Sequence, residues 1–180
     1  ALTLYGDMDV SVIRQLPPGR QPITTAIRSG QAAREKVYKF LVTEAAAGRQ
    51  GYVVCPLVED SDKLSAQSAT EVFRELTSTF LRGIRCGLLH GRMNAVDKEN
   101  VMRDFAEGRI SVLIATTVIE VGINVPKATM MIIEDADRFG LAQLHQLRGR
   151  VGRGSERSFC VLLHDDDVSV ASDDEVVRRA

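Results

Sequence analysis

Short apolar segments alternate with longer amphipathic ones along most of this chain, and this alternation restricts the fold more than any other feature. Runs typical of strands buried on both faces lie at 51–57, 84–89, 110–115, 130–133 and 159–163. Apolar residues at helical spacing predict helices at 31–47, over 69–80, and at 94–107 with Asn94 as N-cap. Such alternation is typical of a parallel sheet with helices on both faces. The sequence therefore predicts an α/β fold with three layers.

The two ends of the chain lack this alternation. Residues 1–29 contain many residues that break regular structure, namely Gly6, Pro17, Pro18, Gly19 and Pro22. Residues 165–180 are rich in acidic side chains, namely Asp165, Asp166, Asp167, Asp173, Asp174 and Glu175. We therefore expect a linker and lead-in at 1–29, one globular lobe at 30–164, and a flexible acidic tail at 165–180.

The overall charge of the chain argues against a general attraction for nucleic acid. With a formal net charge of −1, any contact with phosphates depends on local clusters. One basic cluster precedes the acidic end, because Arg138, Arg148, Arg150 and Arg153 fall within sixteen residues. The charge distribution is therefore polarised along the chain.

The remaining composition indicates a cytosolic globular protein. A hydrophobic content of 44% fits such a protein, and no apolar run reaches the roughly 18 residues that cross a bilayer. The first residues do not resemble a signal peptide. Cys55, Cys86 and Cys160 are widely spaced, so we expect buried free thiols and neither disulfides nor a metal site.

Polar residues follow three of the expected strands. They are His90, Gly91 and Arg92 after the second strand, Thr116 and Thr117 after the third, and 134–138 after the fourth. The carboxyl ends of parallel strands lie at one edge of a sheet, where ligands commonly bind. We therefore expect these three exits to converge on one rim.

The strongest single motif is the segment 143–154, which contains Gln146, Arg150, Arg153 and three glycines. The glycines disfavour a long helix and let the backbone approach a ligand. Guanidinium groups stay charged and offer paired planar donors, which suits a polyphosphate. A solvated arginine-glycine loop is the alternative interpretation.

A second segment, 112–126, ends a strand in two hydroxyls and continues into a loop bounded by glycine and proline. Hydroxyl and amide groups at a strand-to-helix junction can hold nucleic-acid phosphates without reading the bases. Thr116, Thr117 and Asn124 offer such groups. Threonines that merely form a turn are the alternative.

Together these two segments resemble motifs V and VI of superfamily 2 helicases. The sequence of residues 134–154 is similar to that of RecG-type branched-DNA helicases, and transcription-repair coupling translocases share much of it. Segments 4–13 and 16–20 resemble the RecG-type segment that leaves the first motor lobe. The resemblance covers about residues 2–164. It implies the second, C-terminal, RecA-like motor lobe of a bacterial helicase that remodels replication forks and Holliday junctions in repair and recombination.

The resemblance also implies roles for individual residues. Motif VI supplies the catalytic residues Gln146, Arg150 and Arg153, whose arginines reach the γ-phosphate of ATP bound to the other lobe. The residues implied to contact the nucleotide are Gly122, Asn124, Arg150 and Arg153. The residues implied to contact DNA are His90, Gly91, Arg92, Thr116, Thr117 and Glu120. The sequence departs from the pattern at Asn124, where relatives commonly have aspartate, and at Leu147, where many have arginine.

A phosphate-binding loop of the form Gly-x4-Gly-Lys-Ser/Thr is missing from the sequence. We therefore expect ATP and Mg²⁺ to be bound mainly by the first motor lobe, and no metal site in this chain. The chain then resembles an excised fragment that is inactive alone. The acidic residues at 134–137 resemble a Walker B box, but without a phosphate loop they have no nucleotide to serve.

Other functions remain as alternatives. A lobe of a transcription-repair coupling translocase is one, and a nucleic-acid or nucleotide-binding module without a motor is another. An unrelated nucleotide-binding α/β enzyme is a third, although no Gly-x-Gly-x-x-Gly opens a helix after a strand. The order of residues does not suggest a hydrolase triad, and His145 and His164 are interpreted as surface or core side chains.

Overall fold

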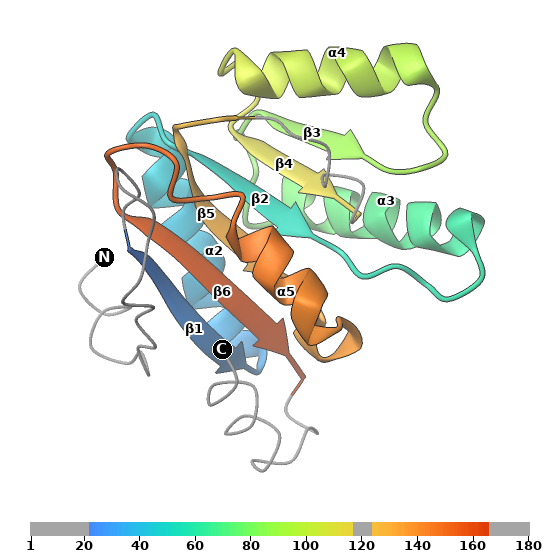
Figure 1. Cartoon of the computed structure of the whole chain (residues 1–180), viewed down its shortest axis with the longest axis horizontal. Helices are drawn as coiled ribbons and strands as arrows, with labels where there is room; N and C mark the ends of the chain where they lie inside the picture. Colours follow the sequence, from blue (N-terminus) through green and yellow to red (C-terminus); the bar gives the residue numbers. More distant parts are fainter. Residues whose placement is uncertain (1–21, 117–123, 166–180) are drawn as a thin grey trace.

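A computed structural model describes residues 22–116 and 124–165 (Figure 1). Within them, six strands form one parallel sheet in the order β1-β6-β5-β2-β4-β3. The strands are β1 (Ile23–Ser29), β2 (Gln50–Val54), β3 (Cys86–Leu89), β4 (Val112–Ala115), β5 (Ala128–Ile133) and β6 (Ser158–His164). The helices are α2 (Gln31–Ala46), α3 (Asp62–Ser78), α4 (Ala95–Ala106), α5 (Leu141–Arg148) and the short 3-10 helix η2 (Ala136–Arg138).

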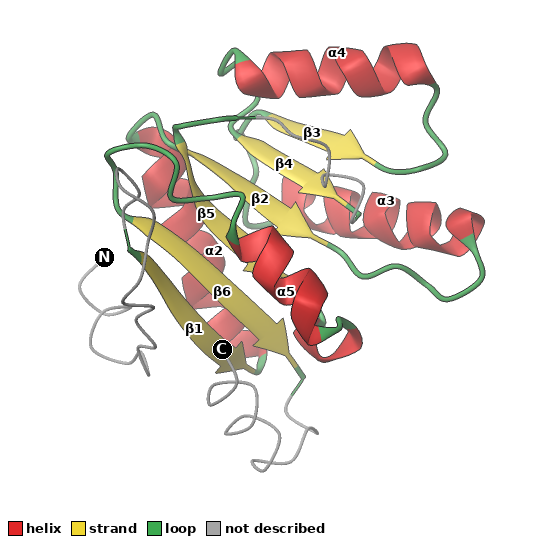
Figure 2. Cartoon of the chain, in the orientation of Figure 1, coloured by secondary structure: helices red, strands yellow, loops and turns green. Residues whose placement is uncertain are grey.

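Helices cover both faces of the sheet, as Figure 2 shows. α2 and α3 lie on one face, and α4 and α5 lie on the other. Successive side chains of β2 point to opposite faces of the sheet. Val53 packs with α2 and α3, whereas Tyr52 and Val54 pack with α4 and α5. The predicted three-layer α/β fold is confirmed.

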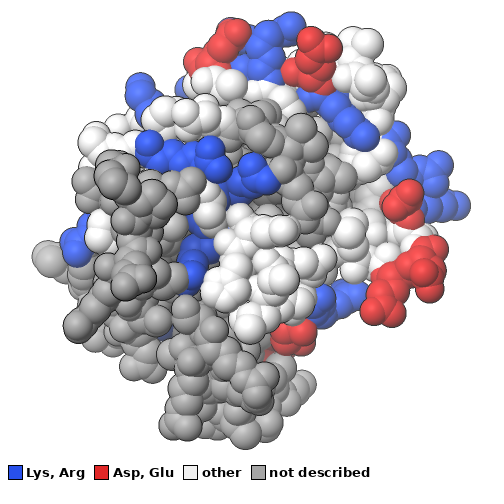
Figure 3. All heavy atoms as spheres, viewed as in Figure 1, with Lys and Arg blue, Asp and Glu red and all other residues white. Residues whose placement is uncertain are grey.

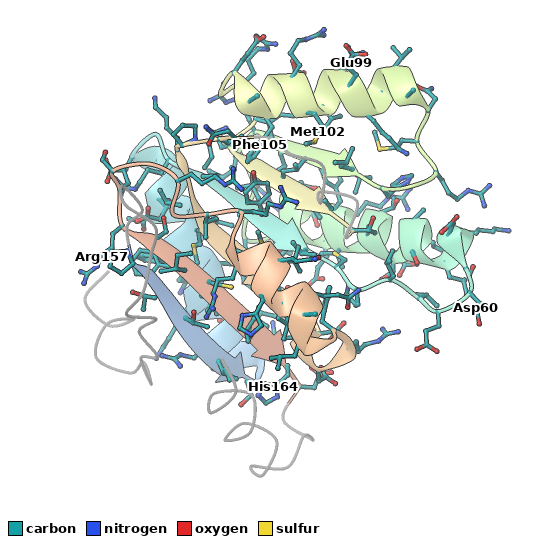
Figure 4. All side chains as sticks on the ribbon, viewed as in Figure 1. Asp60, Glu99, Met102, Phe105, Arg157 and His164 are labelled. Carbon is teal, nitrogen blue, oxygen red and sulfur yellow. The ribbon has the colours of Figure 1, made fainter. Side chains whose placement is uncertain are left out.

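Helix α4 shows how capping and burial place a helix on the sheet. Asn94 Oδ1 accepts a hydrogen bond from the backbone N–H of Asp97 at 2.8 Å, so the predicted N-cap is confirmed. Phe105 points toward the sheet and is fully buried, with its ring 5.0 Å from that of Tyr52 in an edge-on contact. Glu99 points away from the sheet (Figure 4). One face of α4 therefore holds it against the core.

The lobe begins earlier than the sequence predicts. Residues 23–29, assigned above to the lead-in, form edge strand β1, which pairs in parallel with β6 from Ile23↔Ser158 to Ser29↔His164. Only Ala26 of this strand is buried. An edge strand tolerates mixed polar and apolar residues, so no continuous apolar run marks it. The boundary expected at residue 30 is therefore wrong, and the lobe includes residues 23–29.

The other predicted elements are present with shifted ends, and α5 was not predicted. α5 ends where Gly149 begins the glycine-rich loop. Cys55 and Cys160 are buried and Cys86 is half-buried, all as free thiols. The lead-in at 1–21 and the acidic tail at 166–180 lie outside the described residues. No helix among the described residues is both long enough and apolar enough to span a membrane.

Candidate nucleotide and nucleic-acid site

The exits of β3 and β4 lie side by side at the carboxyl edge of the sheet. The two strands are neighbours, and the backbone N–H of Thr116 donates to the carbonyl of Leu89 at 3.1 Å. The exit of β5 lies further along this edge, because β2 separates β5 from β4. There the N–H of Glu134 donates to the carbonyl of Val54 at 2.9 Å. All three exits therefore lie on the predicted rim, but only those of β3 and β4 are neighbours.

The β3 exit carries positive charge. Arg92 is exposed, and Lys98 Nζ donates from α4 to the carbonyl of Gly91 at 3.2 Å. His90 Nδ1 accepts a hydrogen bond from the backbone N–H of Arg92 at 3.2 Å. Partial burial and the charges of Lys98 and Arg92 lower the pKa of His90, so its imidazole is neutral at pH 7. This exit, beside the N-terminus of α4, can bind an anion.

Thr116 is closed off from the surface. Its side chain is 1% exposed, and Oγ1 lacks a hydrogen-bond partner within the described residues. Burial of an unpaired hydroxyl costs roughly 1–3 kcal/mol, so packing alone does not explain a threonine here. Of the other motif V residues, Asn124 is exposed, whereas Thr117, Glu120 and Gly122 lie outside the described residues.

The two motif VI arginines are carried by the loop 149–157, which connects α5 to β6 and is called the arginine loop below. Val151 is fully buried between them and ties the loop to the core under α5. Arg150 and Arg153 are half-buried, and Arg153 Nε donates to the carbonyl of Gly149 at 3.3 Å. The loop therefore presents both guanidinium groups from a fixed base.

The charges of Arg150 and Arg153 both influence the pKa of one tyrosine, Tyr52. Burial raises the pKa of Tyr52 to about 12, and the charges of Arg150 and Arg153 oppose that rise. Both arginines therefore lie near β2, on the face that α4 and α5 cover. Lysine and arginine side chains gather over the arginine loop in the surface view (Figure 3).

The arginine loop lies away from the carboxyl rim. α5 begins near that rim and runs back across the sheet, so the loop reaches the segment before β5 (Figure 1). A Cβ atom built on Gly154 would lie only 2.5 Å from the carbonyl oxygen of Pro126. Arg150 and Arg153 of the arginine loop therefore lie apart from His90, Arg92 and Thr116 at the exits of β3 and β4.

The residues before the arginine loop divide between surface and core. Gln146 is exposed on α5, whereas Leu147 is 1% exposed and belongs to the core beneath this helix. An arginine at position 147 would place a charge in that core, which gives a physical reason for the leucine.

Arg148 points into the protein and not toward a ligand site. It is 9% exposed, its Nη1 donates to Thr25 Oγ1 at 3.5 Å, and burial lowers its pKa. Arg138 lies in η2 at the carboxyl rim. Of the four clustered arginines of the sequence, only Arg150 and Arg153 therefore share the arginine loop.

Glu134 belongs to a buried ionic network that the sequence did not reveal. Its Oε1 accepts hydrogen bonds from Arg34 Nε at 3.0 Å and from the hydroxyl of Tyr38 at 2.5 Å. Arg34 also pairs with Glu75 at 2.8 Å. Burial has the largest influence on Glu134 and raises its pKa, while these two hydrogen bonds lower it. Because its carboxylate is engaged in this way, the contacts support a structural role and not a Walker B role.

A cavity of about 450 Å³ opens at the carboxyl rim between the β2–α3 loop and η2. Three carboxylates line it, those of Glu59, Asp60 and Asp62, beside Arg138. Their negative charges disfavour a phosphate there. Within the described residues, no group of three histidine, cysteine or acidic side chains could hold a metal ion.

Comparison with known proteins assigns the chain to a family. Residues 32–155 match the helicase conserved C-terminal domain family. The ATP-dependent DNA helicase RecG of Bacillus subtilis is 48% identical over 165 residues, which cover 92% of this chain and 24% of that protein. The same helicase of Thermotoga maritima is 49% identical over 166 residues, which cover 92% of this chain and 21% of that protein. The chain thus spans less than a quarter of these relatives.

Solved structures show the same relationship. A structure of RecG bound to a three-way DNA junction has a TM-score of 0.71 and 44% identity, covering 99% of this chain and 22% of that one. S. cerevisiae Dbp5 bound to RNA and ADP BeF3 has a TM-score of 0.59 and 21% identity, covering 86% and 38%, a likeness of fold alone. The chain therefore belongs to the helicase conserved C-terminal domain family, with the RecA-like fold of the C-terminal lobe of RecG-type helicases in superfamily 2.

Proposed function

We propose that this chain is the C-terminal motor lobe of an ATP-dependent DNA helicase, and that it supplies Arg150 and Arg153 to ATP held by a first motor lobe. The observation that carries the proposal is the arginine loop, in which buried Val151 lies between two half-buried arginines on one face of the sheet. Preorganised cations of this kind stabilise the charge that develops on a transferring phosphoryl group.

ATP and Mg²⁺ are held mainly by the first lobe in this proposal. The chain has no phosphate-binding loop, and Glu134 is engaged by Arg34 and Tyr38. Its described residues therefore do not fit Mg²⁺. Gln146 on α5, together with Gly122 and Asn124 of motif V, completes this lobe's nucleotide contacts.

The DNA backbone lies along the exits of β3 and β4 in this proposal. Arg92 and Lys98 supply the charge, and the N-terminus of α4 adds its dipole. Thr116 can take part only if the β4 exit opens on binding, because its hydroxyl is buried. Contacts of this kind hold the backbone without reading its sequence. The further members of this proposed surface are His90, Gly91, Thr117 and Glu120.

Branched DNA is the proposed substrate, with fork and junction remodelling in the bacterial cytosol as the proposed role. Curated relatives named RecG are 47–51% identical to this chain, and one RecG structure holds a three-way DNA junction. These likenesses favour a RecG-type enzyme over a transcription-repair coupling translocase.

The test compares ATP turnover by the chain alone with turnover by the full-length helicase that carries it, each with and without a three-way junction. The chain alone should hydrolyse no more ATP than its Arg150→Ala variant, which controls for contaminating ATPases. The full-length enzyme should show turnover that the junction stimulates. Turnover by the chain alone that Arg150→Ala abolishes would overturn the division of the site between two lobes.

A further inference from the structure

The arginine loop and the segment before β5 touch backbone to backbone at one point. A Cβ atom on Gly154 would meet the carbonyl oxygen of Pro126 at 2.5 Å, its carbonyl carbon at 3.2 Å and its Cβ at 3.4 Å. The φ angle of Gly154 lies outside the left-handed region that favours glycine. Glycine is therefore required here for space, and not for an unusual backbone conformation.

The Pro126 side of this contact is held firmly. Val125 is 2% exposed, and the N–H of Ala128 closes a turn onto its carbonyl at 3.0 Å. The N–H of Gln50 donates to the carbonyl of Lys127 at 2.7 Å. The buried Gln50 side chain then donates to the carbonyls of Phe105 and Ile110 at 2.6 and 2.8 Å, which fixes β2 to the end of α4.

The Gly154 side is held by the core under α5. Val151 is fully buried, and Gly152 is buried with a φ of 77°, a conformation that other residues rarely adopt. Arg153, directly before Gly154, is tied to Gly149 through its Nε. Neither backbone can yield freely, so displacement at one side passes to the other.

We infer that Gly154 is a positioning residue, which sets Arg153 against the motif V segment 124–126 and so joins the DNA-facing connection to the ATP-facing arginine. The inference rests on the function proposed above. Asn124 and Pro126 end the connection that leaves the β4 exit, and Arg153 precedes the glycine that rests on it. A shift of that connection when DNA binds would reach Arg153 through this contact.

The effect of filling the contact can be sized from its geometry. Real Cβ atoms do not approach an oxygen closer than about 3.0 Å, so Gly154→Ala must move the loop or Pro126 by about 0.5 Å. Misplacing a catalytic group by about 1 Å can cost on the order of 10²-fold in rate. We therefore expect kcat to fall by about 10-fold or more, with the affinity for DNA changed less than about threefold.

The experiment measures single-turnover ATP hydrolysis, KM for ATP and junction affinity in the full-length helicase. Gly140→Ala is the matched control, because the nearest atom to its Cβ is Gln143 Oε1 at 3.8 Å. Pro126→Gly perturbs the contact from the other side by freeing the backbone that carries the carbonyl, and it serves if Gly154→Ala does not fold. Both Gly154→Ala and Pro126→Gly should lower the DNA-stimulated rate more than the basal rate, while Gly140→Ala should change neither.

Combining each variant with Arg153→Ala separates a positioning role from a general loss of enzyme structure. If the contact acts through Arg153, then Gly154→Ala and Pro126→Gly should add less than about threefold to the loss caused by Arg153→Ala. The inference would be overturned if the losses of rate multiplied in the double variants. It would also be overturned if the Gly154→Ala and Pro126→Gly enzymes behaved like Gly140→Ala. Unchanged turnover in Arg153→Ala itself would instead overturn the proposed function.

Discussion

Replacing Glu134 by alanine tests how the carboxyl rim is held together. Glu134 Oε1 accepts hydrogen bonds from Tyr38, which is fully buried, and from Arg34, whose side chain is 16% exposed. Arg34 also lies over the rings of Tyr38 and Phe80, 5.2 and 5.8 Å from their centroids. The substitution removes the shared acceptor and leaves the groups that used it in place.

The expected loss in the free energy of unfolding is about 3 kcal/mol. The Tyr38 hydroxyl, buried without an acceptor, costs roughly 1–3 kcal/mol. Removing one partner of a buried ion pair costs roughly 3–5 kcal/mol when the remaining charge is uncompensated. Arg34 keeps Glu75 at 2.8 Å, so we expect this second contribution to be less than half of that range. Glu134→Gln keeps an acceptor near both donors and should cost about 1 kcal/mol.

Urea unfolding followed by circular dichroism measures these losses, with Glu99→Ala on the outer face of α4 as the control. Tyr38→Phe should cost about 1 kcal/mol, and the double variant Tyr38→Phe/Glu134→Ala should lose about 1 kcal/mol less than the sum of the two single losses. A loss below about 1 kcal/mol for Glu134→Ala, or strictly additive losses, would refute the reasoning that one acceptor links these side chains.

The same carboxyl group predicts a pH dependence. Burial raises the pKa of Glu134 above its ordinary value of 4.5, so the folded chain binds this proton more tightly than the unfolded chain. Its contribution to stability is therefore fully present below pH 4.5 and is lost as pH rises through the folded pKa. As the pH rises from 4.5 through the folded pKa of Glu134, the free energy of unfolding of the native chain should fall relative to that of the Glu134→Gln variant. A rise in that difference would contradict the direction of the pKa shift.

Other predictions concern thiols, a helix cap and DNA. Burial raises the pKa of Cys55 and Cys160 to about 12, so a thiol reagent at pH 8 should label these two buried thiols only after unfolding. Half-buried Cys86, whose pKa burial raises to about 11, should be labelled before them. Rapid labelling of Cys55 or Cys160 in the folded chain would count against their burial. Asn94→Ala should cost about 1 kcal/mol and Asn94→Asp much less, as urea unfolding can show; equal losses would mean that the cap to Asp97 contributes nothing. Arg92→Ala should reduce the slope of log DNA affinity against log salt by about 0.7–0.9, and an unchanged slope would remove Arg92 from the DNA surface.

The part of the fold that could be predicted from sequence is the part with regular burial. β2, β4 and β5 are covered on both faces, so each reads as an apolar run, and the helices show a period set by a single buried face. β1 escaped prediction because an edge strand in which one residue is buried has no such run. Whether residues 23–29 form a strand depends on their pairing with β6, which is distant in sequence.

The residue types of the proposed site could be recognised in the sequence, but their arrangement in space could not. The glycines and arginines of 149–154 indicated a loop with fixed cations, and Arg150 and Arg153 do lie together. The inward direction of Arg148 could not be predicted, because it depends on β1 and β6 beneath α5. The contact of Gly154 with Pro126 likewise joins two segments that only the folded sheet brings together.

The measurement that tests the central claim most directly is junction-stimulated ATP turnover by the full-length helicase with Arg150→Ala or Arg153→Ala. Arg74→Ala, an exposed arginine of α3 on the opposite face of the sheet, is the matched control. If the arginine loop completes the ATP site, each loop variant should lose on the order of 10³- to 10⁵-fold in turnover while folding and junction affinity stay near those of the native enzyme. Arg150→Lys should recover little of this loss, because an ammonium group cannot reproduce a planar fork of donors. Turnover near the native value in both alanine variants would contradict the account and leave the arginine loop as a solvated surface.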